Sequence, residues 1–470
     1  MIQSPAESFS GELSGELRTV HAGLSGTDLR FRELASADPE LLDRRTFRSL
    51  DRWSSLLTYK RQPWPTFISR AESAGIETMS VGISRLIRSI PERVFQNDAA
   101  RVAQVYGIAE NVARFLLQPP NGIDGLLSRG DFVRGRSGFK CVEFNMSSSL
   151  GGWETGPLAG MLQQIPPIAR FLRETGLEVR YKDTLRITLV HILRRAVEAG
   201  LADDGEIHTT FTAREALPLS YPEAIAFLDR EYQAALAEVD PALRGTLGFC
   251  NYTALSERDG ALYAQNRRIR CVIERHVYAS ERITARLAKL GRIHLYNGPA
   301  ARIMSDKTNI AILSAHEESP LFSAEERELI RKHVPWTRPA VPGPTTFRGE
   351  TVPMDRMLLA RREEMVLKKV RSLGGYDVVL GIFSTPNEWE AAVGSAFSQG
   401  DWLAQEYIES LPYLFQAGSY GCSPHDVVWG PFVSGSTYAG TILRVQPKSL
   451  QGIVNLSQGA TEGILLEVDE

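Results

Sequence analysis

Four polar residues between positions 129 and 145 form the first group whose spacing could support chemistry. Arg129 and Asp131 lie in SRGDF, and Glu143 and Asn145 lie in CVEFN. The run DFVRGRSGFKCVEFN reads as a strand, a turn at residues 137–138 and a second strand, which predicts a β-hairpin. On a strand Glu143 and Asn145 face the same side, and the hairpin can bring Asp131 beside them.

Three oxygen ligands would then converge at one place. Magnesium is usually held by one or two carboxylates together with substrate phosphates, and an arginine such as Arg129 can bind a phosphate or carboxylate with its planar fork. The alternative is that Asp131 and Glu143 are solvated residues of an edge strand, because most Asp and Glu side chains are exposed. The SSSLGG that follows could cradle an anion or form a plain loop.

The second group lies in MVLKKVRSLGGYDVVLG, residues 365–381. A strand that reaches Lys368 and is followed by Gly374 and Gly375 offers an ammonium group and a backbone that can approach a nucleotide phosphate closely. It is not a P-loop, because the Gly-Lys-Ser/Thr order is absent. The alternative is a glycine pair that only turns the chain.

The third group is WLAQEYI, residues 402–408, an apolar strand interrupted by Gln405 and Glu406. Sites that bind adenine combine apolar walls with a few polar groups, and an extended segment can supply both. An ordinary half-buried strand is the alternative. Its position shortly after the lysine- and glycine-rich segment favours the binding interpretation.

The elements expected to position these groups follow from hydrophobic spacing. The first hundred or so residues have helical spacing interrupted by Pro63, Pro65 and Pro91, and residues 83–90 form an amphipathic helix. Residues 157–240 mix helices and short strands, as α/β layers do. A Ser-x-x-Glu capping box opens a helix at Ser323, a proline-rich loop over residues 338–356 could act as a lid, and β-rich runs over residues 365–466 predict an antiparallel sheet.

Composition narrows the class of protein. The 470 residues include 53 basic and 56 acidic side chains, for a net charge of -3, so no bulk field attracts nucleic acid or an anionic membrane. The four cysteines are far apart and the eight histidines are scattered. The sequence therefore shows none of the spacings typical of zinc sites, redox-active cysteine pairs or nucleophilic triads. Without a signal-like start or a long apolar run, we expect a cytoplasmic protein.

The order of these motifs resembles a known family. Arg-x-Asp-Phe is followed by Glu-Phe-Asn, then Asp-Lys at residues 306–307, Val-Leu-Lys with Gly-Gly, Trp-x-x-Gln-Glu-Tyr-Ile, and a terminal run with glycine, arginine and asparagine. Together this order resembles the circularly permuted ATP-grasp ligases, among them the glutathionylspermidine synthetase type. The resemblance extends from about residue 64 to the C-terminus.

The resemblance implies a complete set of site residues. Mg²⁺ would be bound by Asp131, Glu143 and Asn145, with Arg129 on the transferred phosphate and Arg444 near the acyl phosphate. ATP would be bound by Lys307, Lys368, Gly374, Gly375, Gln405, Glu406, Tyr407, Ile408 and Asn455, with Gly459 nearby. The chain departs from the family in having Lys368-Lys369 where relatives often have Lys-Pro, so either lysine could point inward, and in having glycine within Arg-Gly-Asp-Phe. It has no room for the amidase domain of some relatives.

We therefore expect an α/β (α+β) protein with a circularly permuted ATP-grasp fold. Its expected parts are a mainly helical region 1–120, a metal-binding hairpin part 121–165, a central α/β substrate region 166–300 and an ATP-binding part 301–470. The implied reaction uses ATP and Mg²⁺ to form an amide through an acyl phosphate, joining a small-molecule carboxylate to an amine, with an amino acid or small peptide as substrate.

Three alternatives stay open at this stage. The acceptor could be a thiol or hydroxyl, the product could be a phosphorylated metabolite, or the chain could be a non-catalytic ATP-binding module. We expect no nucleic-acid or membrane partner, and a homodimer is an open possibility.

Overall fold

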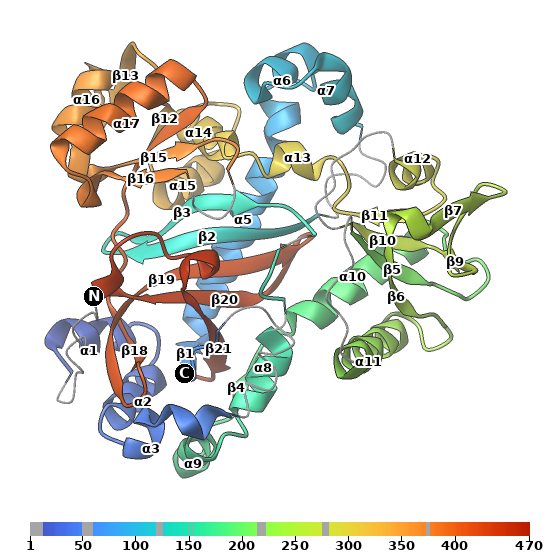
Figure 1. The fold of residues 1–470 in the computed structure, drawn as a ribbon, viewed down its shortest axis with the longest axis horizontal. Coiled ribbons are helices and arrows are strands. Elements are labelled where there is room, and N and C mark those ends of the chain that lie inside the picture. Colours follow the sequence, from blue (N-terminus) through green and yellow to red (C-terminus); the bar gives the residue numbers. More distant parts are fainter. Residues whose placement is uncertain are drawn as a thin grey trace.

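A long helix and an eight-stranded sheet form the centre of the molecule (Figure 1). The computed structural model describes residues 13–48, 60–118, 126–148, 150–153, 155–213, 222–274, 282–372 and 377–470. The fold is mixed α/β, with helices and several separate sheets, as the sequence predicted. None of the helices in these residues is long and apolar enough to cross a membrane.

The central sheet combines strands from both ends of the chain. Its order is β1-β21-β20-β19-β2-β3, with β18 beside β19 and β4 beside β21. Only β1 and β21 pair in parallel. The strands are β1 (Thr66–Ser69), β2 (Leu127–Gly135), β3 (Gly138–Asn145), β4 (Val179–Arg180), β18 (Tyr413–Ala417), β19 (Gly421–Ser434), β20 (Thr437–Pro447) and β21 (Thr461–Val468).

The predicted hairpin is present as β2 and β3. Its two-residue turn is at 136–137 rather than 137–138, because Gly138 already pairs with Gly135. Gly138 has a φ of +92°, which favours glycine there. The register changes after Asp131, so that Val142 is an extra residue, a β-bulge on β3.

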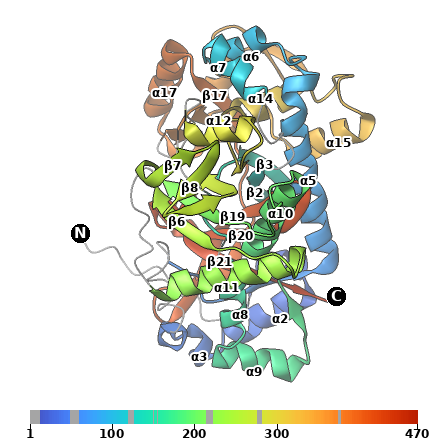
Figure 2. The same cartoon turned by 90° about the vertical axis from the view of Figure 1, so that its right-hand side faces the viewer.

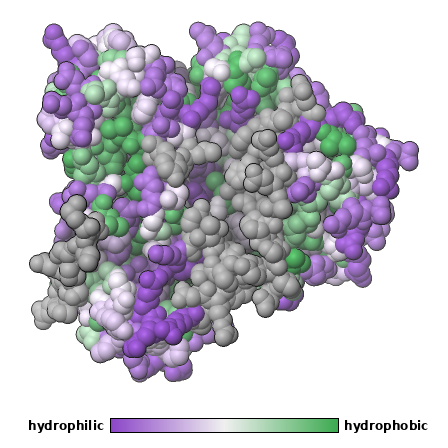
Figure 3. All heavy atoms as spheres, viewed as in Figure 1, coloured by the Kyte–Doolittle hydropathy of each residue, from purple (hydrophilic) through white to green (hydrophobic). Residues whose placement is uncertain are grey.

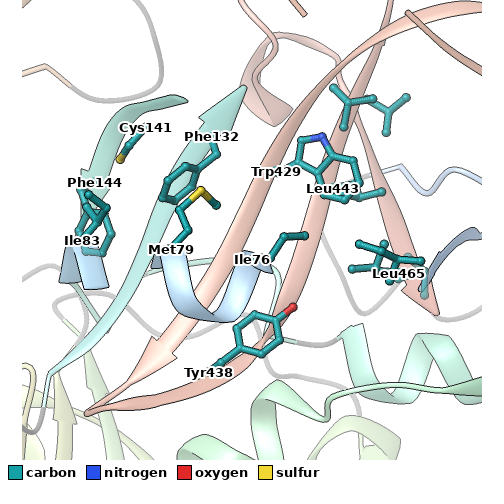
Figure 4. Close-up of a cluster of buried hydrophobic side chains, with 14 of the residues drawn as sticks. Ile76, Met79, Ile83, Phe132, Cys141, Phe144, Trp429, Tyr438, Leu443 and Leu465 are labelled. Carbon is teal, nitrogen blue, oxygen red and sulfur yellow. The ribbon is translucent and has the colours of Figure 1, made fainter. Parts of the chain in front are cut away.

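Helix α5 (Arg70–Arg93) covers one face of this sheet (Figure 2). It includes the amphipathic segment 83–90, and Pro91 lies inside its last turn instead of interrupting it. Ile76, Met79 and Ile83 belong to the same buried apolar cluster as the sheet residues Phe132, Cys141, Phe144, Trp429 and Leu443 (Figure 4). This packing fixes which face of the sheet is apolar.

In its described residues, the N-terminal region is mainly helical and contains one strand, β1. Its helices are α1 (Gly15–Ala22), α2 (Gly26–Ala35), α3 (Pro39–Leu42), the 3-10 turn η1 (Arg44–Phe47), α5, α6 (Ala99–Tyr106) and α7 (Glu110–Leu116). Further along the chain, α13 (Ala301–Met304), α14 (Thr308–Ala315) and α15 (Ala324–His333) follow one another, and the predicted capping box of Ser323 and Glu326 opens α15.

A smaller antiparallel sheet forms the lobe at the upper left of Figure 1. Its order is β12-β17-β15-β16, so the C-terminal strands divide between two sheets, whereas the sequence indicated one. Residues 338–356 contain a β-hairpin and are not a plain loop. The elements are β12 (Thr337–Pro339), β13 (Pro344–Phe347), β14 (Glu350–Pro353), α16 (Met354–Ala360), η3 (Arg362–Glu364), β15 (Met365–Lys369), β16 (Val378–Leu380), η4 (Gly381–Phe383), α17 (Pro386–Gln399) and β17 (Trp402–Glu406).

Figure 3 shows a concentration of apolar side chains on this small-sheet lobe, whereas hydrophilic side chains dominate the outer surface of the region at the right of the view. Ile382 and Phe383, both exposed, belong to the small-sheet lobe. The lobe that carries Lys368 and Gln405 therefore also offers apolar surface.

The region at the right of Figure 1 contains a parallel sheet of order β11-β10-β5-β6. Separate apolar clusters link one of its faces to α10 and α11 and the other to α12 and a three-stranded sheet. The predicted α/β layers are thus present. The elements are α8 (Thr155–Leu162), α9 (Pro166–Thr175), α10 (Thr184–Glu198), β5 (Thr209–Ala213), α11 (Pro222–Val239), β6 (Leu247–Asn251), η2 (Tyr252–Ala254), β7 (Leu255–Arg258), β8 (Ala261–Ala264), β9 (Arg267–Ile269), β10 (Cys271–Glu274), α12 (Ile283–Lys289) and β11 (His294–Tyr296).

Because α5 supplies the apolar cover of the central sheet, we expect Ile83→Ala to destabilise the fold by about 2–5 kcal/mol through the cavity it leaves. Ile225→Ala on α11 is the matched control, since Ile225 is exposed and its loss should change stability by less than about 0.5 kcal/mol. Urea unfolding followed by circular dichroism measures both. Equal midpoints for the two variants would contradict the packing of α5 on the sheet.

Candidate functional site

The face of the central sheet turned away from α5 carries a group of charged side chains. Asp131 is opposite Glu143, and Arg129 is opposite Asn145, so all four predicted residues share this face of the β2–β3 hairpin. Arg444 reaches the same face from β20. Its register partner on β19 is Val428, which in turn is opposite Val133 of β2.

Asp131 is the centre of this group. Its Oδ1 lies 2.5 Å from Arg444 Nη2 and 3.3 Å from Arg129 Nε, and all three side chains are nearly buried. Burial, the largest influence, raises the pKa of Asp131, but Arg444 and Arg129 together lower it further, so the net pKa lies below its ordinary value. Asp131 is therefore an anion at neutral pH that holds two guanidinium groups in place.

A glycine on β19 leaves space for this arrangement. A Cβ atom at Gly430 would lie 3.1 Å from Arg129 Cδ and 2.8 Å from Ile442 Cγ2. Any larger residue there would push against the arginine side chain. The strand thus keeps its smallest residue beside the charged group.

Two lysines reach this face from outside the central sheet. Lys307, just before α14, places Nζ 3.6 Å from Glu143 Oε1 and donates to the Ser372 carbonyl at 2.6 Å. Lys368 of β15 donates to the carbonyl of the bulge residue Val142 at 3.1 Å. The small sheet and the central sheet therefore meet at Lys368.

Lys368 also donates to Gln405 Oε1 at 2.7 Å. Burial lowers the pKa of Lys368 to about 8, against the opposing effect of Glu143. Its neighbour Lys369 points to the other side of β15, where Nζ donates to Gln399 Oε1 at 3.1 Å and lies 3.7 Å from Asp401. Of the two lysines, Lys368 is the one that belongs to the charged group.

The predicted adenine segment is divided by strand alternation. Gln405 is buried, and its Nε2 donates to Thr337 Oγ1 at 3.0 Å. Glu406 turns to the other side and pairs with Arg348 at 2.9 Å. Beyond β17, the Tyr407 backbone N–H donates to the Glu364 carbonyl, and Ile408 lies against Gly135 of β2. Only Gln405 of the four contacts the charged group.

The remaining predicted residues are not part of the charged group or lie outside the described residues. Asn455 caps η6 (Leu456–Gln458), where its Oδ1 accepts from the Ser457 backbone N–H at 3.0 Å, and Gly459 ends that turn with a φ of +99°. Gly374 and Gly375 lie outside the described residues, as does residue 149 of the SSSLGG segment.

Two of the three arginines at positions 338, 348 and 356 have partners of their own. Arg348 is in the hairpin turn and pairs with Glu364 and Glu406. Arg338 donates to Ser314 Oγ at 2.8 Å. Arg356, on α16, is exposed.

Cations outnumber carboxylates in this group. Arg129 and Arg444 contact Asp131, and Lys307 Nζ lies 3.6 Å from Glu143. Lys368 contacts neither carboxylate but is close enough for both to oppose the lowering of its pKa, so four cations stand against two carboxylates. Glu462, the register partner of Arg444 on β21, is paired with Arg61 at 2.6 Å. This second buried pair adds no net charge. Uncompensated buried charge is costly, so the site is suited to an anion with more than one charge.

Asp131, Glu143 and Asn145 are the candidate oxygen ligands of a magnesium ion at this site. Opposed residues of a hairpin have Cβ atoms about 4.5–5.5 Å apart, so Asp131 and Glu143 can share one ion, with Asn145 next along the same face. Within the described part of the chain, no group of three His, Cys, Asp or Glu residues is arranged to hold a metal. The three residues alone could supply only part of the coordination shell of such an ion.

Two contributors were not singled out in the sequence. Thr337 bonds to Gln405, and Glu462, opposite Arg444 on β21, pairs with Arg61. Glu462 had a signal, since it is the acid that opens EGILLEV, a segment that is apolar apart from Glu462 and Glu467. Thr337 had none, because its role depends on how β12 and β17 pair.

No family model matches the chain, and a search of the curated proteins found no significant match. The functional interpretation therefore depends on the geometry described above.

We expect Asp131→Asn to destabilise the protein by about 3–5 kcal/mol, because Arg129 and Arg444 would lose the buried charge that they share. Glu409→Gln is the control, since Glu409 forms an exposed pair with Lys448 that is worth at most about 1 kcal/mol. Urea midpoints at pH 7 measure the difference. A change at Asp131 as small as that at Glu409 would show that the pair does not form.

Proposed function

We propose that this protein is an ATP-dependent carboxylate–amine ligase with a circularly permuted ATP-grasp fold. The observation that carries the proposal is the excess of positive charge where the central sheet and the small sheet meet. Four cations surround two carboxylates there, and a nucleotide polyphosphate with bound Mg²⁺ would supply the missing negative charge and use the oxygen ligands.

The order of the elements supports the permuted arrangement. The hairpin with Asp131 and Glu143 precedes the small sheet in the chain, yet β2 pairs with β19, which follows the small sheet. The small sheet is thus connected between the two halves of the central sheet. A nucleotide between the sheets would have Lys368 and Gln405 on one side and the β2–β3 face on the other.

Each residue then has a defined chemical task. Lys368, with a pKa of about 8, stays mostly protonated at neutral pH and would bind phosphate oxygens together with Lys307. Arg129 and Arg444, held by Asp131, would bind the phosphoryl group during transfer. Because these donors are already in position, they can stabilise developing charge without reorganisation. Asp131, Glu143 and Asn145 would hold Mg²⁺, and the bound ion would neutralise part of the negative charge of the phosphates.

The proposed reaction has two balanced steps. A substrate carboxylate oxygen attacks the γ-phosphorus of ATP, the bond to the β-phosphate oxygen breaks, and ADP leaves. The amine nitrogen then attacks the acyl phosphate carbon, the C–O bond to phosphate breaks, and the amine loses a proton. The products are an amide, ADP and phosphate. Positioning and electrostatic stabilisation suffice, so no covalent enzyme nucleophile is needed.

The two neighbouring lysines of β15 test nucleotide binding. We expect Lys368→Met to weaken ATP binding about 10- to 100-fold, because it removes a charged hydrogen-bond donor from the site. Lys369→Met should change binding less than about threefold, since that ammonium lies on the opposite side near the surface. Isothermal titration with ATP and MgCl₂ measures both. Equal losses would place the nucleotide elsewhere.

Turnover is tested by ADP release from ATP and MgCl₂ with pairs drawn from the L-amino acids and small primary amines, followed by mass spectrometry of the products. We expect release that requires both partners and yields an amide. Arg444→Met should lower kcat about 10²- to 10³-fold, because it removes a donor to the transferred group. Arg331→Met, an exposed arginine on α15, is the control and should leave kcat unchanged.

Each of the other possible results would indicate a different function. ATP binding without ADP release across the panel would indicate a non-catalytic binding module. A thioester or ester product would indicate a thiol or hydroxyl acceptor. Absence of ATP binding would refute the proposed function.

A further inference from the structure

A second group of buried polar side chains lies at the carboxyl ends of the parallel strands. Glu274 ends β10, and its register partner on β5 is Thr212, which is itself opposite Cys250 on β6. Register partners in a parallel sheet share a face. In open α/β sheets, ligands bind outside the carboxyl ends of the strands.

Among the described residues, the Glu274 carboxylate has no cationic partner at contact distance. Its side chain is buried, and Oε1 accepts a hydrogen bond from Thr284 Oγ1 of α12. Among the described residues, no lysine, arginine or histidine nitrogen lies within 4.0 Å of its carboxylate. Burial chiefly raises the pKa of Glu274, and Arg282 lowers it only in part. A cation brought by a ligand would restore the balance.

The hydroxyl group of Thr212 is a second, independent indication of a binding site here. Its side chain is fully buried, and in the described part of the chain its Oγ1 has no hydrogen-bond partner. Buried hydroxyl groups are almost always bonded, because an unbonded one costs free energy. This hydroxyl is on the strand next to Glu274, at the same level of the sheet.

A guanidinium group completes the set. Arg282 immediately precedes α12, two residues before Thr284, and its guanidinium carbon lies 3.7 Å from the ring centroid of Tyr252. The aromatic ring orients Arg282 close enough to influence Glu274 electrostatically, but the two do not form an ion pair at contact distance. A carboxylate and a guanidinium that are close but unpaired are suited to the ammonium and carboxylate of one zwitterion.

This edge of the sheet is joined through Asn297 to the beginning of β2, the strand that carries Arg129 and Asp131. Asn297, directly after β11, accepts from the Leu127 N–H at 2.6 Å and donates to the Leu127 carbonyl at 2.8 Å. Leu127 begins β2, two residues before Arg129. The path from Glu274 to Arg129 therefore runs from β10 across β11 and the Asn297 side chain to β2.

From this arrangement we infer that Glu274, Thr212 and Arg282 form a binding site for the α-amino acid end of a substrate. Glu274 and Thr212 bind the ammonium group, and Arg282 binds the carboxylate. The inference rests on the proposed function for its place in the reaction, in which the far end of this substrate meets the nucleotide. The binding itself requires no ATP.

The test is isothermal titration of the full chain, without ATP, against the twenty L-amino acids and against n-propylamine and propanoate, which carry only one charge of alanine each. We expect at least one amino acid to bind, and both single-charge probes to bind more weakly than alanine does. Glu274→Gln should weaken binding of the tightest amino acid about 10- to 100-fold and leave ATP binding unchanged. Thr212→Val, which preserves shape, should weaken it about threefold or more.

Glu257→Gln is the matched control, because Glu257 lies on the adjacent β7 and pairs with Arg286 on the surface. It should leave binding of the tightest amino acid unchanged. If Glu274→Gln does not fold, the shape-preserving Thr212→Val decides. The inference is wrong if no amino acid binds, or if the Glu274 and Thr212 variants bind it as the unaltered protein does.

The outcomes separate this inference from the proposed function. Amino acid binding that depends on Glu274, without ADP release, would support the binding site and refute the ligase. ADP release that requires an amino acid, with the same KM in Glu274→Gln, would support the ligase and place its substrate elsewhere.

Discussion

The buried ion pair between Asp131 and Arg444 is the interaction on which the arrangement of the site depends. It connects β2 to β20 across the intervening strand β19, on the face of the sheet opposite α5. Because α5 covers the other face with an apolar core, the pairing register decides which side chains emerge beside Asp131. A slip of one residue would turn Asp131 into that core and expose Phe132, so core packing and site chemistry select the same register.

Once Asp131 holds Arg129 and Arg444, the protein has used one carboxylate on two guanidinium groups. Lys307 and Lys368 add positive charge beside the remaining carboxylate. A structural salt-bridge network would be expected to come closer to neutrality, as the pair of Arg61 and Glu462 behind it does. The imbalance therefore favours a role in anion binding over a role in folding alone.

Local patterns were readable in the sequence, and long-range ones were not. The hairpin with Asp131 and Glu143 was predicted correctly because strand alternation is a local property, and its turn was one residue off because a glycine can either occupy a turn or follow one. The orientation of Lys368 could not be predicted, since alternation shows that adjacent residues face opposite sides but not which side is covered. The partner of Asp131, Arg444, comes from a strand at the other end of the chain, and no local pattern specifies it.

The connection between the parallel sheet and the central sheet has a further consequence. Asn297 bonds to both backbone groups of Leu127, so the carboxyl edge near Glu274 is held to the beginning of β2. The small sheet approaches the same strands from the opposite side through Lys368. A substrate bound at the parallel sheet and a nucleotide bound by the small sheet would therefore meet over β2 and β3, where Arg129 and Asp131 lie. For the proposed ligase, this arrangement would place substrate recognition and the reaction on different sheets, so that substitutions near Glu274 could change specificity without altering the charged group.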